Sequence, residues 1–550
     1  MKKILSLVLC VVMVVSLLSG CDLLALLGGL SQRESSPTEP IPAEPINTGW
    51  EKHLVYTLNQ DTVDYFYACL ETAEDLSVNG PDWETVDAAI EELDDAYMEL
   101  VDQYQIAYVL YCADQSDEAK SQRYLDAMDI CTDAELAYNE MARNAYQSDS
   151  PYIEQLFEDW TPEEIDMMLK HNDEIAALEK RNSEITVEYR DLNPSTMETD
   201  MIPLYNELVS NNNRMAQIYG YDNYYDFAYK MIYNRDYDST QLQKMRNYAA
   251  EYLSEISQNT LLAFYAALDE LDDQAQVLFS DILWTDYNML DEDYVGGYIA
   301  DQGLSTAAAM RDMFDNDRVL FTNSPNAYEG AFTTFIDDEP FCYYGPGYMG
   351  NETMIHELGH YYGGKYVNGF ELPMDLCETQ SQSNEWLFIR YLGDEVPEEL
   401  YRAIVEYKLA NESSNIITFM LVDAFEELVY THENAGNLTA QEYDDLMVQA
   451  AELFGGIDFV RENICDIQSY WKIVVVESPV YYISYAVSSV ASINLFTIAE
   501  EDEAAARECY RKLVEEADEN EGFLWNIQQA GLSGPFDEAV YQELAERYEN

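Results

Sequence analysis

Two histidines four residues apart, with a glutamate directly after the first, form the most specific chemical pattern in the chain. The pattern is His356-Glu357-Leu358-Gly359-His360, in a chain that holds only five histidines. On a helix, residues four apart project from one face, so both imidazoles can bind one metal ion. Glu357 would lie beside them, placed to take a proton from a water molecule that the metal activates. The pattern therefore predicts a catalytic metal site.

A third protein ligand is needed, because a catalytic zinc site usually has three protein ligands and one open position. No third histidine lies near the motif, so we expect a carboxylate. The candidates downstream are Glu371, Asp375, Glu378 and Glu385. Glu378 and Glu385 are seven residues apart, about two helical turns, so that if one binds the metal the other can hydrogen-bond a ligand. The pattern alone leaves the choice open.

The motif is expected on a short helix of its own that follows a small sheet. Asn351 and Glu352 suit the start of this helix, and Gly363-Gly364 suits its end. Aromatic and threonine residues between Leu320 and Tyr344 favour strands, with turn residues at 324–326 and 337–340. We therefore expect a small β-sheet next to the metal-binding helix.

The rest of the chain is predicted to be mainly helical. Val86, Ile90, Leu93 and Tyr97 lie on one helical face, and the segment 77–83 separates two helices. Thr161-Pro162-Glu163-Glu164 is a favourable helix start with a potential capping box. A break at 193–196 suggests an N-terminal helical region at 50–195 and a catalytic region at 196–550.

The N-terminus is predicted to direct export and lipid anchoring. Residues 1–20 carry two lysines and then an apolar run too short to span a bilayer, as in a signal peptide. The segment Leu18-Ser19-Gly20-Cys21 resembles a bacterial lipobox, which implies a lipid on Cys21; a plain secretory cleavage site is the alternative. The Pro-, Ser- and Glu-rich segment that follows makes 21–49 an anchor and flexible linker.

Composition excludes some partners. The formal net charge of −77 would repel nucleic acid and anionic lipid headgroups. Membrane attachment would therefore depend on the lipid on Cys21. Apart from Cys21, the exported chain has seven widely spaced cysteines, which do not form a disulfide framework, although one or two bridges remain open. We expect His53 and His171, in acidic helical surroundings, at the surface.

The segment after the motif resembles a known family. HELGH followed by Glu378-Thr379-Gln380-Ser381-Gln382 is similar to the thimet oligopeptidase and oligoendopeptidase F family, whose ExxSQ-type segment supplies the third zinc ligand. This resemblance implies Glu378 as that ligand, with Glu385 hydrogen-bonded behind a ligand. The resemblance covers residues from about 200 to about 500 and is weaker outside the HExxH motif and Glu378. The gap from His360 to Glu378 is shorter than the family pattern, and no histidine follows His432.

The resemblance also implies an architecture and a substrate. Family members are large, mainly helical, two-lobed bodies around a deep channel that admits short unstructured peptides. Gly330-Ala331-Phe332 is similar to the family strand that pairs with an extended substrate. Tyr482 and Tyr485, in a tyrosine-rich segment near the C-terminus, would donate hydrogen bonds to the oxyanion. One Zn²⁺ ion is the implied cofactor, with cobalt or manganese as other possibilities.

The predicted function is an extracellular zinc-dependent oligopeptidase that cuts internal bonds of short peptides at the outer face of a bacterial cytoplasmic membrane. A metallocarboxypeptidase or dipeptidyl carboxypeptidase is the first alternative. Only Lys365 and Arg390 lie near the motifs to hold a substrate carboxylate, which favours an endopeptidase. The second alternative is a lipoprotein that binds peptides without cutting them.

Overall fold

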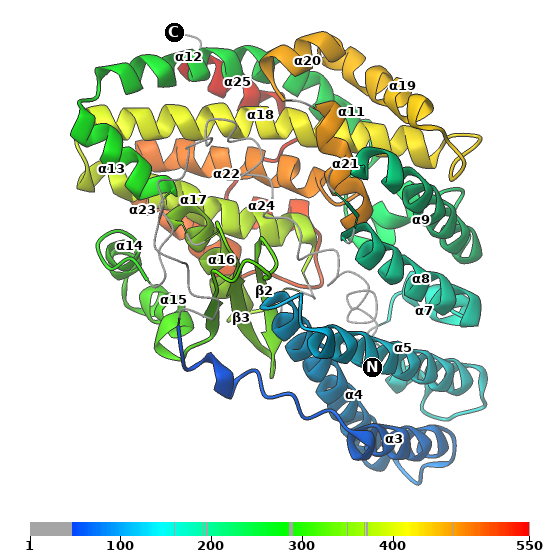
Figure 1. Ribbon diagram of the computed structural model, residues 1–550. Coiled ribbons are helices and arrows are strands. Elements are labelled where there is room, and N and C mark those ends of the chain that lie inside the picture. Colours follow the sequence, from blue (N-terminus) through cyan, green and yellow to red (C-terminus); the bar gives the residue numbers. More distant parts are fainter. Residues whose placement is uncertain are drawn as a thin grey trace.

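The computed structural model describes residues 47–548 except for 159, 191, 194–195, 285–289, 349, 368, 370–371 and 466. In this part of the chain, helices surround one three-stranded sheet (Figure 1). The expected mainly helical fold with a small sheet is therefore confirmed. The signal peptide, Cys21 and nearly all of the 21–49 linker lie outside the described residues, so these assignments stay predictions.

Three long helices form the N-terminal lobe: α3 (Gln60–Asn79), α4 (Trp83–Cys112) and α5 (Glu118–Gln147). The predicted apolar face of α4 is confirmed, because Val86, Ile90, Leu93 and Tyr97 are all buried. Asp82 caps the start of α4 by accepting a hydrogen bond from the Thr85 amide.

The remaining helices form the larger part of the molecule. Their bounds are α6 (Ile153–Leu156), α7 (Pro162–Lys170), α8 (Asp173–Arg190), α9 (Met197–Tyr219), α10 (Tyr224–Phe227), α11 (Ser239–Tyr248), α12 (Ser254–Glu270), α13 (Asp273–Trp284), α14 (Val295–Asp301), α15 (Leu304–Asp315), α16 (Asn351–Gly364), α17 (Met374–Glu395), α18 (Glu398–Tyr430), α19 (Ala440–Ala451), α20 (Ile457–Asn463), α21 (Ile467–Glu477), α22 (Ile483–Glu501), α23 (Glu503–Glu515), α24 (Phe523–Ala530) and α25 (Glu538–Tyr548). The capping box predicted at Thr161 and Glu164 is present at the start of α7.

Long helices that lie side by side form the larger part of the molecule around α16 and α17 (Figure 1). Helix α18 packs along α12, and α17 packs along both α22 and α16 (Figure 1). Helix α22 is long and apolar enough to cross a membrane, but 89% of its apolar stretch is buried inside the protein. It is therefore a core helix, and this burial explains its continuous apolar sequence.

The sheet has the strand order β1-β3-β2, with β1 (Val319–Phe321), β2 (Ala331–Ile336) and β3 (Glu339–Tyr344). Strands β2 and β3 are antiparallel, and β1 is parallel to β3. The β2–β3 turn consists of Asp337 and Asp338, both with positive φ, as a tight two-residue hairpin requires. Because β2 is last in the strand order, it is an edge strand within the described residues.

The sheet lies between two hydrophobic cores. Alternate side chains of a strand point to opposite faces. Phe341 and Tyr343 of β3 belong to the core of the N-terminal lobe, whereas Cys342 and Tyr344 belong to the larger core. The two cores meet again at α7, where Met167 and Met168 fall into different cores. This junction lies upstream of the predicted 195/196 boundary, which remains a prediction.

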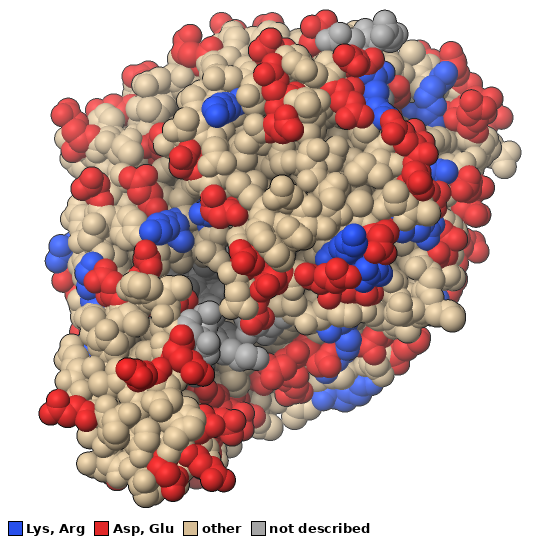
Figure 2. All heavy atoms as spheres, turned by 180° about the vertical axis from the view of Figure 1, so that it is seen from behind, with Lys and Arg blue, Asp and Glu red and all other residues tan. Residues whose placement is uncertain are grey.

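The surface is hollowed between the N-terminal lobe and the larger part. Figure 2 shows this hollow from behind, with acidic side chains gathered on both of its sides on this face. Acidic residues also cover much of the remaining surface in this view, as expected from 105 acidic residues against 28 basic ones.

Candidate active site

Helices α16 and α17 hold the predicted metal ligands and pack closely. A Cβ atom at Gly359 would lie 2.6 Å from the Cα of Ser381, so only glycine permits this approach. Helix α16 ends at Gly364, as predicted. The predicted cap is wrong, because Gly350 is the N-cap and the Asn351 side chain donates instead to the Ile282 carbonyl at 2.9 Å.

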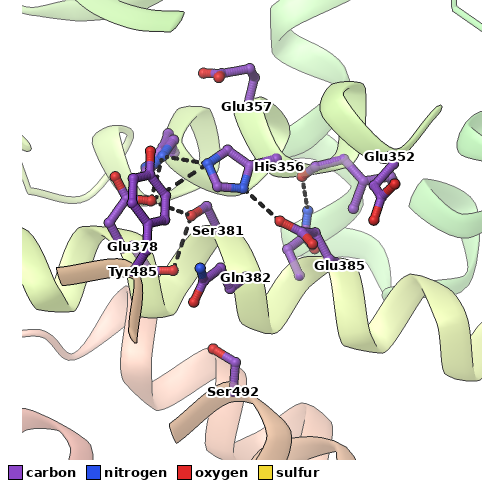
Figure 3. A network of polar contacts seen from close by, with 12 residues as sticks. Glu352, His356, Glu357, Glu378, Ser381, Gln382, Glu385, Tyr485 and Ser492 are labelled. Atoms are coloured by element: carbon purple, nitrogen blue, oxygen red, sulfur yellow. Dashed lines mark hydrogen bonds and ion pairs between the residues drawn. The ribbon is translucent and has the colours of Figure 1, made fainter. Parts of the chain in front are cut away.

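The three predicted ligands converge. One ligand atom from each of His356, His360 and Glu378 lies within 4.8 Å of the others. Oε2 of Glu378 is 3.5 Å from Nε2 of His356 and 3.6 Å from Nε2 of His360, and the two Nε2 atoms are 3.2 Å apart (Figure 3). This arrangement fits a single divalent ion with two imidazoles and one carboxylate.

The electrostatics of Glu378 also fit such an ion. Burial alone would raise the pKa of the Glu378 carboxyl, but the charge of His360, with hydrogen bonds from His356 and His360, holds the pKa well below its usual range. The carboxylate is therefore ionised and available as a ligand.

A buried network of charges lies behind His356. Its Nδ1 is 2.6 Å from Oε1 of Glu385, which leaves Nε2 for an ion (Figure 3). The other oxygen of Glu385 accepts a hydrogen bond from Lys408 on α18. Lys408 also pairs with Glu352 at 2.9 Å and Glu412 at 2.8 Å, and its side chain is only 2% exposed. Glu385 thus lies where its spacing from Glu378 allowed, in direct contact with one of the predicted histidine ligands.

Of the remaining acidic candidates, Asp375 lies away from the two histidines. Asp375 is fully buried and lies 3.7 Å from Arg235. Burial raises its pKa, and the charge of Arg235 opposes this rise. Glu371 lies outside the described residues. Among the described candidates, Glu378 is thus the one beside both imidazoles.

Glu357 does not point at the metal ligands in this structure. Its carboxylate accepts a hydrogen bond from the Thr333 hydroxyl of β2 at 2.7 Å. Figure 3 shows the side chain directed away from His356 and Glu378. A role as the general base therefore requires Glu357 to leave Thr333 and rotate toward the histidines. Catalytic contacts are often incomplete in structures without substrate.

The tyrosines near the C-terminus lie in different places. Tyr485 is close to the ligands, with its ring centroid 6.5 Å from that of His356. Tyr482 is buried and stacks on Phe419 with ring centroids 5.8 Å apart. The hydroxyl of Tyr481, which the sequence analysis did not single out, donates to Oε1 of Glu378.

The predicted substrate strand forms the edge of the sheet. Ala331 begins β2, and the Gly330 carbonyl accepts from the Gly345 amide at 2.7 Å. The Phe332 side chain is buried and stacks on Tyr343, with ring centroids 4.9 Å apart. It therefore belongs to the core, and only the backbone of β2 is available for pairing with a peptide.

Comparisons with known proteins agree with this fold. No protein-family model matches the sequence, and no curated protein matches it. Among solved structures, PZ peptidase A with an inhibitor gives a TM-score of 0.67 at 15% identity, covering 90% of this chain and 97% of that one. A Bacillus anthracis protein provisionally named oligoendopeptidase F gives 0.67 at 16% identity, with 92% and 98% covered. Oligoendopeptidase F from Enterococcus faecium gives 0.54 at 12% identity, with 89% and 96% covered.

These matches cover nearly the whole length of each chain. The resemblance to oligoendopeptidase F is therefore confirmed for the fold, although identities of 12–16% carry no residue roles. The roles of the site residues depend on the geometry described above.

Proposed function

We propose that this protein is a metal-dependent peptidase that hydrolyses internal bonds of short, unstructured peptides. The observation that carries the proposal is the convergence of His356, His360 and Glu378 on adjacent helices of an oligoendopeptidase-like fold. A metal-ligand set of two imidazoles and one carboxylate with an open position is typical of hydrolytic zinc enzymes.

Different side chains of the protein would have different roles in catalysis. A zinc ion on the three ligands would supply Lewis acidity, which polarises a carbonyl and lowers the pKa of a bound water to about 7. Glu385 orients His356 through Nδ1. Glu357, after release from Thr333, accepts the proton of the attacking water and passes it to the leaving amine. Tyr485 is the tyrosine best placed to donate to the developing oxyanion.

An extended peptide would pair with the free edge of β2. In an antiparallel pair, alternate residues of an edge strand direct their backbone groups away from the partner. Thr333 of β2 contacts Glu357 directly, so a peptide on this edge would lie beside the proposed base. Backbone pairing selects extended chains and tolerates many side chains.

An endopeptidase is favoured over a carboxypeptidase by the basic residues near the motif. A carboxypeptidase needs a free cation for the substrate C-terminus. Lys365 pairs with Asp312 and Glu339, and Arg390 pairs with Glu503 and Asp394. Neither side chain is available without breaking an ion pair.

The test is hydrolysis of a mixed pool of short peptides, with the cuts mapped by mass spectrometry. We expect internal cuts that disappear in Glu357→Gln and after chelation, while Glu357→Gln keeps its metal. Trimming from the C-terminus alone would support the carboxypeptidase. A folded, metal-loaded protein that cuts nothing would support the peptide-binding lipoprotein.

The proposed location is the outer face of a bacterial membrane, with a lipid on Cys21. The support is the sequence of residues 1–21. We expect Cys21→Ala to abolish incorporation of a labelled fatty acid. Unchanged labelling would contradict the anchor at this position.

A further inference from the structure

A second group of residues that could hold a metal ion lies far along the chain from the candidate active site. It consists of Glu135 on α5, His171 at the C-terminal cap of α7, and Glu179 on α8. One ligand atom from each lies within 4.8 Å of the others. Our expectation of a surface position for His171 is wrong, since the residue is only 5% exposed.

One nitrogen of the His171 imidazole is hydrogen-bonded, and the other has no hydrogen-bond partner in the part of the chain that the structure describes. Its Nδ1 is 2.9 Å from the Tyr219 hydroxyl. Its backbone carbonyl accepts from Arg143 at 2.6 Å, and its amide donates to the Met167 carbonyl at 2.9 Å. In contrast, Nε2 is buried and has no hydrogen-bond partner among the described residues. A ligand histidine typically has this arrangement, with one nitrogen bonded behind and the other free for the ion.

The two carboxylates also lack a compensating cation. No lysine or arginine of the described residues forms an ion pair with Glu135 or Glu179. Glu135 is only 3% exposed, and Glu179 is partly buried beside it. A buried carboxyl and a partly exposed one, beside an unpartnered imidazole nitrogen, are costly unless protons or a cation neutralise them.

We propose that Glu135, His171 and Glu179 bind a second divalent transition-metal ion, of which Zn²⁺ is the best match to one imidazole and two carboxylates. Ligand atoms within 4.8 Å of one another can close around an ion at Zn–N and Zn–O distances of about 2.0–2.2 Å with small side-chain shifts. Glu179 is partly exposed, so a water molecule can reach the fourth position.

The position of this site indicates a structural role. Glu135 belongs to a helix of the N-terminal lobe, whereas His171 and Glu179 lie where the two hydrophobic cores meet. Metal binding here would join α5 to the α7–α8 corner, and its binding free energy would stabilise the contact between the lobes.

The test isolates this site from the candidate active site. The full chain carrying His356→Gln and His360→Gln is stripped with a chelator and then titrated with Zn²⁺, with calorimetry and thermal unfolding as readouts. We expect one ion per chain and a higher unfolding temperature. Adding His171→Gln should weaken binding at least about 100-fold, whereas adding His53→Gln should leave it unchanged.

Two results would overturn the proposal. One is the absence of Zn²⁺ binding in the His356→Gln, His360→Gln chain, which would mean that protons neutralise the cluster. The other is binding that His171→Gln does not weaken. Should the triple variant fail to fold, anomalous scattering at the zinc edge from Zn²⁺-soaked wild-type crystals decides between a peak at His171 and none. These readouts do not depend on peptidase activity.

Discussion

The Tyr481 hydroxyl donates a hydrogen bond to Oε1 of Glu378, the carboxylate whose other oxygen lies 3.5 Å from Nε2 of His356. Tyr481, in the turn between α21 and α22, thus fixes the orientation of a proposed metal ligand on α17. Partners of metal ligands usually contribute 10- to 100-fold to metal affinity.

Tyr481→Phe is therefore expected to weaken zinc binding about 10-fold, because Glu378 loses a donor and can rotate. The measurement is competition for Zn²⁺ with a chromogenic chelator. Tyr482→Phe is the matched control, since Tyr482 stacks on Phe419 and should leave zinc affinity unchanged. Equal effects of both changes would show that the Tyr481 contact does not hold Glu378.

Glu385→Gln is expected to lower zinc affinity by about 10-fold or more, since a neutral amide orients and polarises His356 less well than a carboxylate. Glu412→Gln tests the same network without touching His356, because Glu412 contacts Lys408 and Ser489. Its zinc affinity should equal that of the wild type. A wild-type affinity in Glu385→Gln would refute the positioning role.

Lys408→Met is expected to destabilise the fold by about 3–5 kcal/mol, because two buried carboxylates and the partly buried Glu352 lose their shared cation. Lys365→Met removes a cation from two carboxylates that are partly exposed, and should cost about 1 kcal/mol or less. Denaturant unfolding of both variants measures the difference. Similar losses of unfolding free energy in the two variants would show that burial of the carboxylates does not set the cost of removing the cation.

The contribution of Asp102 to the free energy of unfolding is expected to fall as the pH rises from about 4 to about 7. Burial raises the pKa of Asp102 to about 7, opposed by a hydrogen bond from the Asp337 amide and reinforced by the charges of nearby acidic residues. The folded state then holds a proton that the unfolded state releases, so the contribution is complete below about pH 4 and lost by about pH 7.

Asp102→Asn should remove this component, which has a slope of at most about 1.4 kcal/mol per pH unit. The measurement is the free energy of unfolding at several pH values between 4 and 7. Asp126→Asn, at an exposed position of α5, is the control. Parallel pH profiles for wild type and Asp102→Asn would show that Asp102 does not titrate in this range.

The grouping of His356, His360 and Glu378 could be predicted because their spacing is local, whereas their role as metal ligands stays a prediction. His356 and His360 share a face of one helix, and the sequence after Glu378 carries a family pattern. The choice among three tyrosines could not be predicted. Val480 adopts φ of +62° and its backbone amide donates a hydrogen bond to Glu426, in the same turn that places the Tyr481 hydroxyl beside Glu378.

The positions of Lys408 and His171 could not be predicted from the sequence either. Lys408 is 48 residues after His360, and its place behind Glu385 depends on how α18 packs on α17. His171 has acidic neighbours that suggest a surface, but the packing of α5 and α9 buries it. Both side chains lie at contacts between helices that are distant in the sequence.

The position of the sheet between the two cores has a consequence for folding. Each of β2 and β3 contributes side chains to both cores, so neither core is complete unless the same backbone is ordered for the other. Melting of the N-terminal lobe would uncover Phe332 and Tyr343, and so loosen the strands that α16 packs against. We therefore expect the two halves to unfold in one cooperative transition, with the hairpin as the shared segment that couples them.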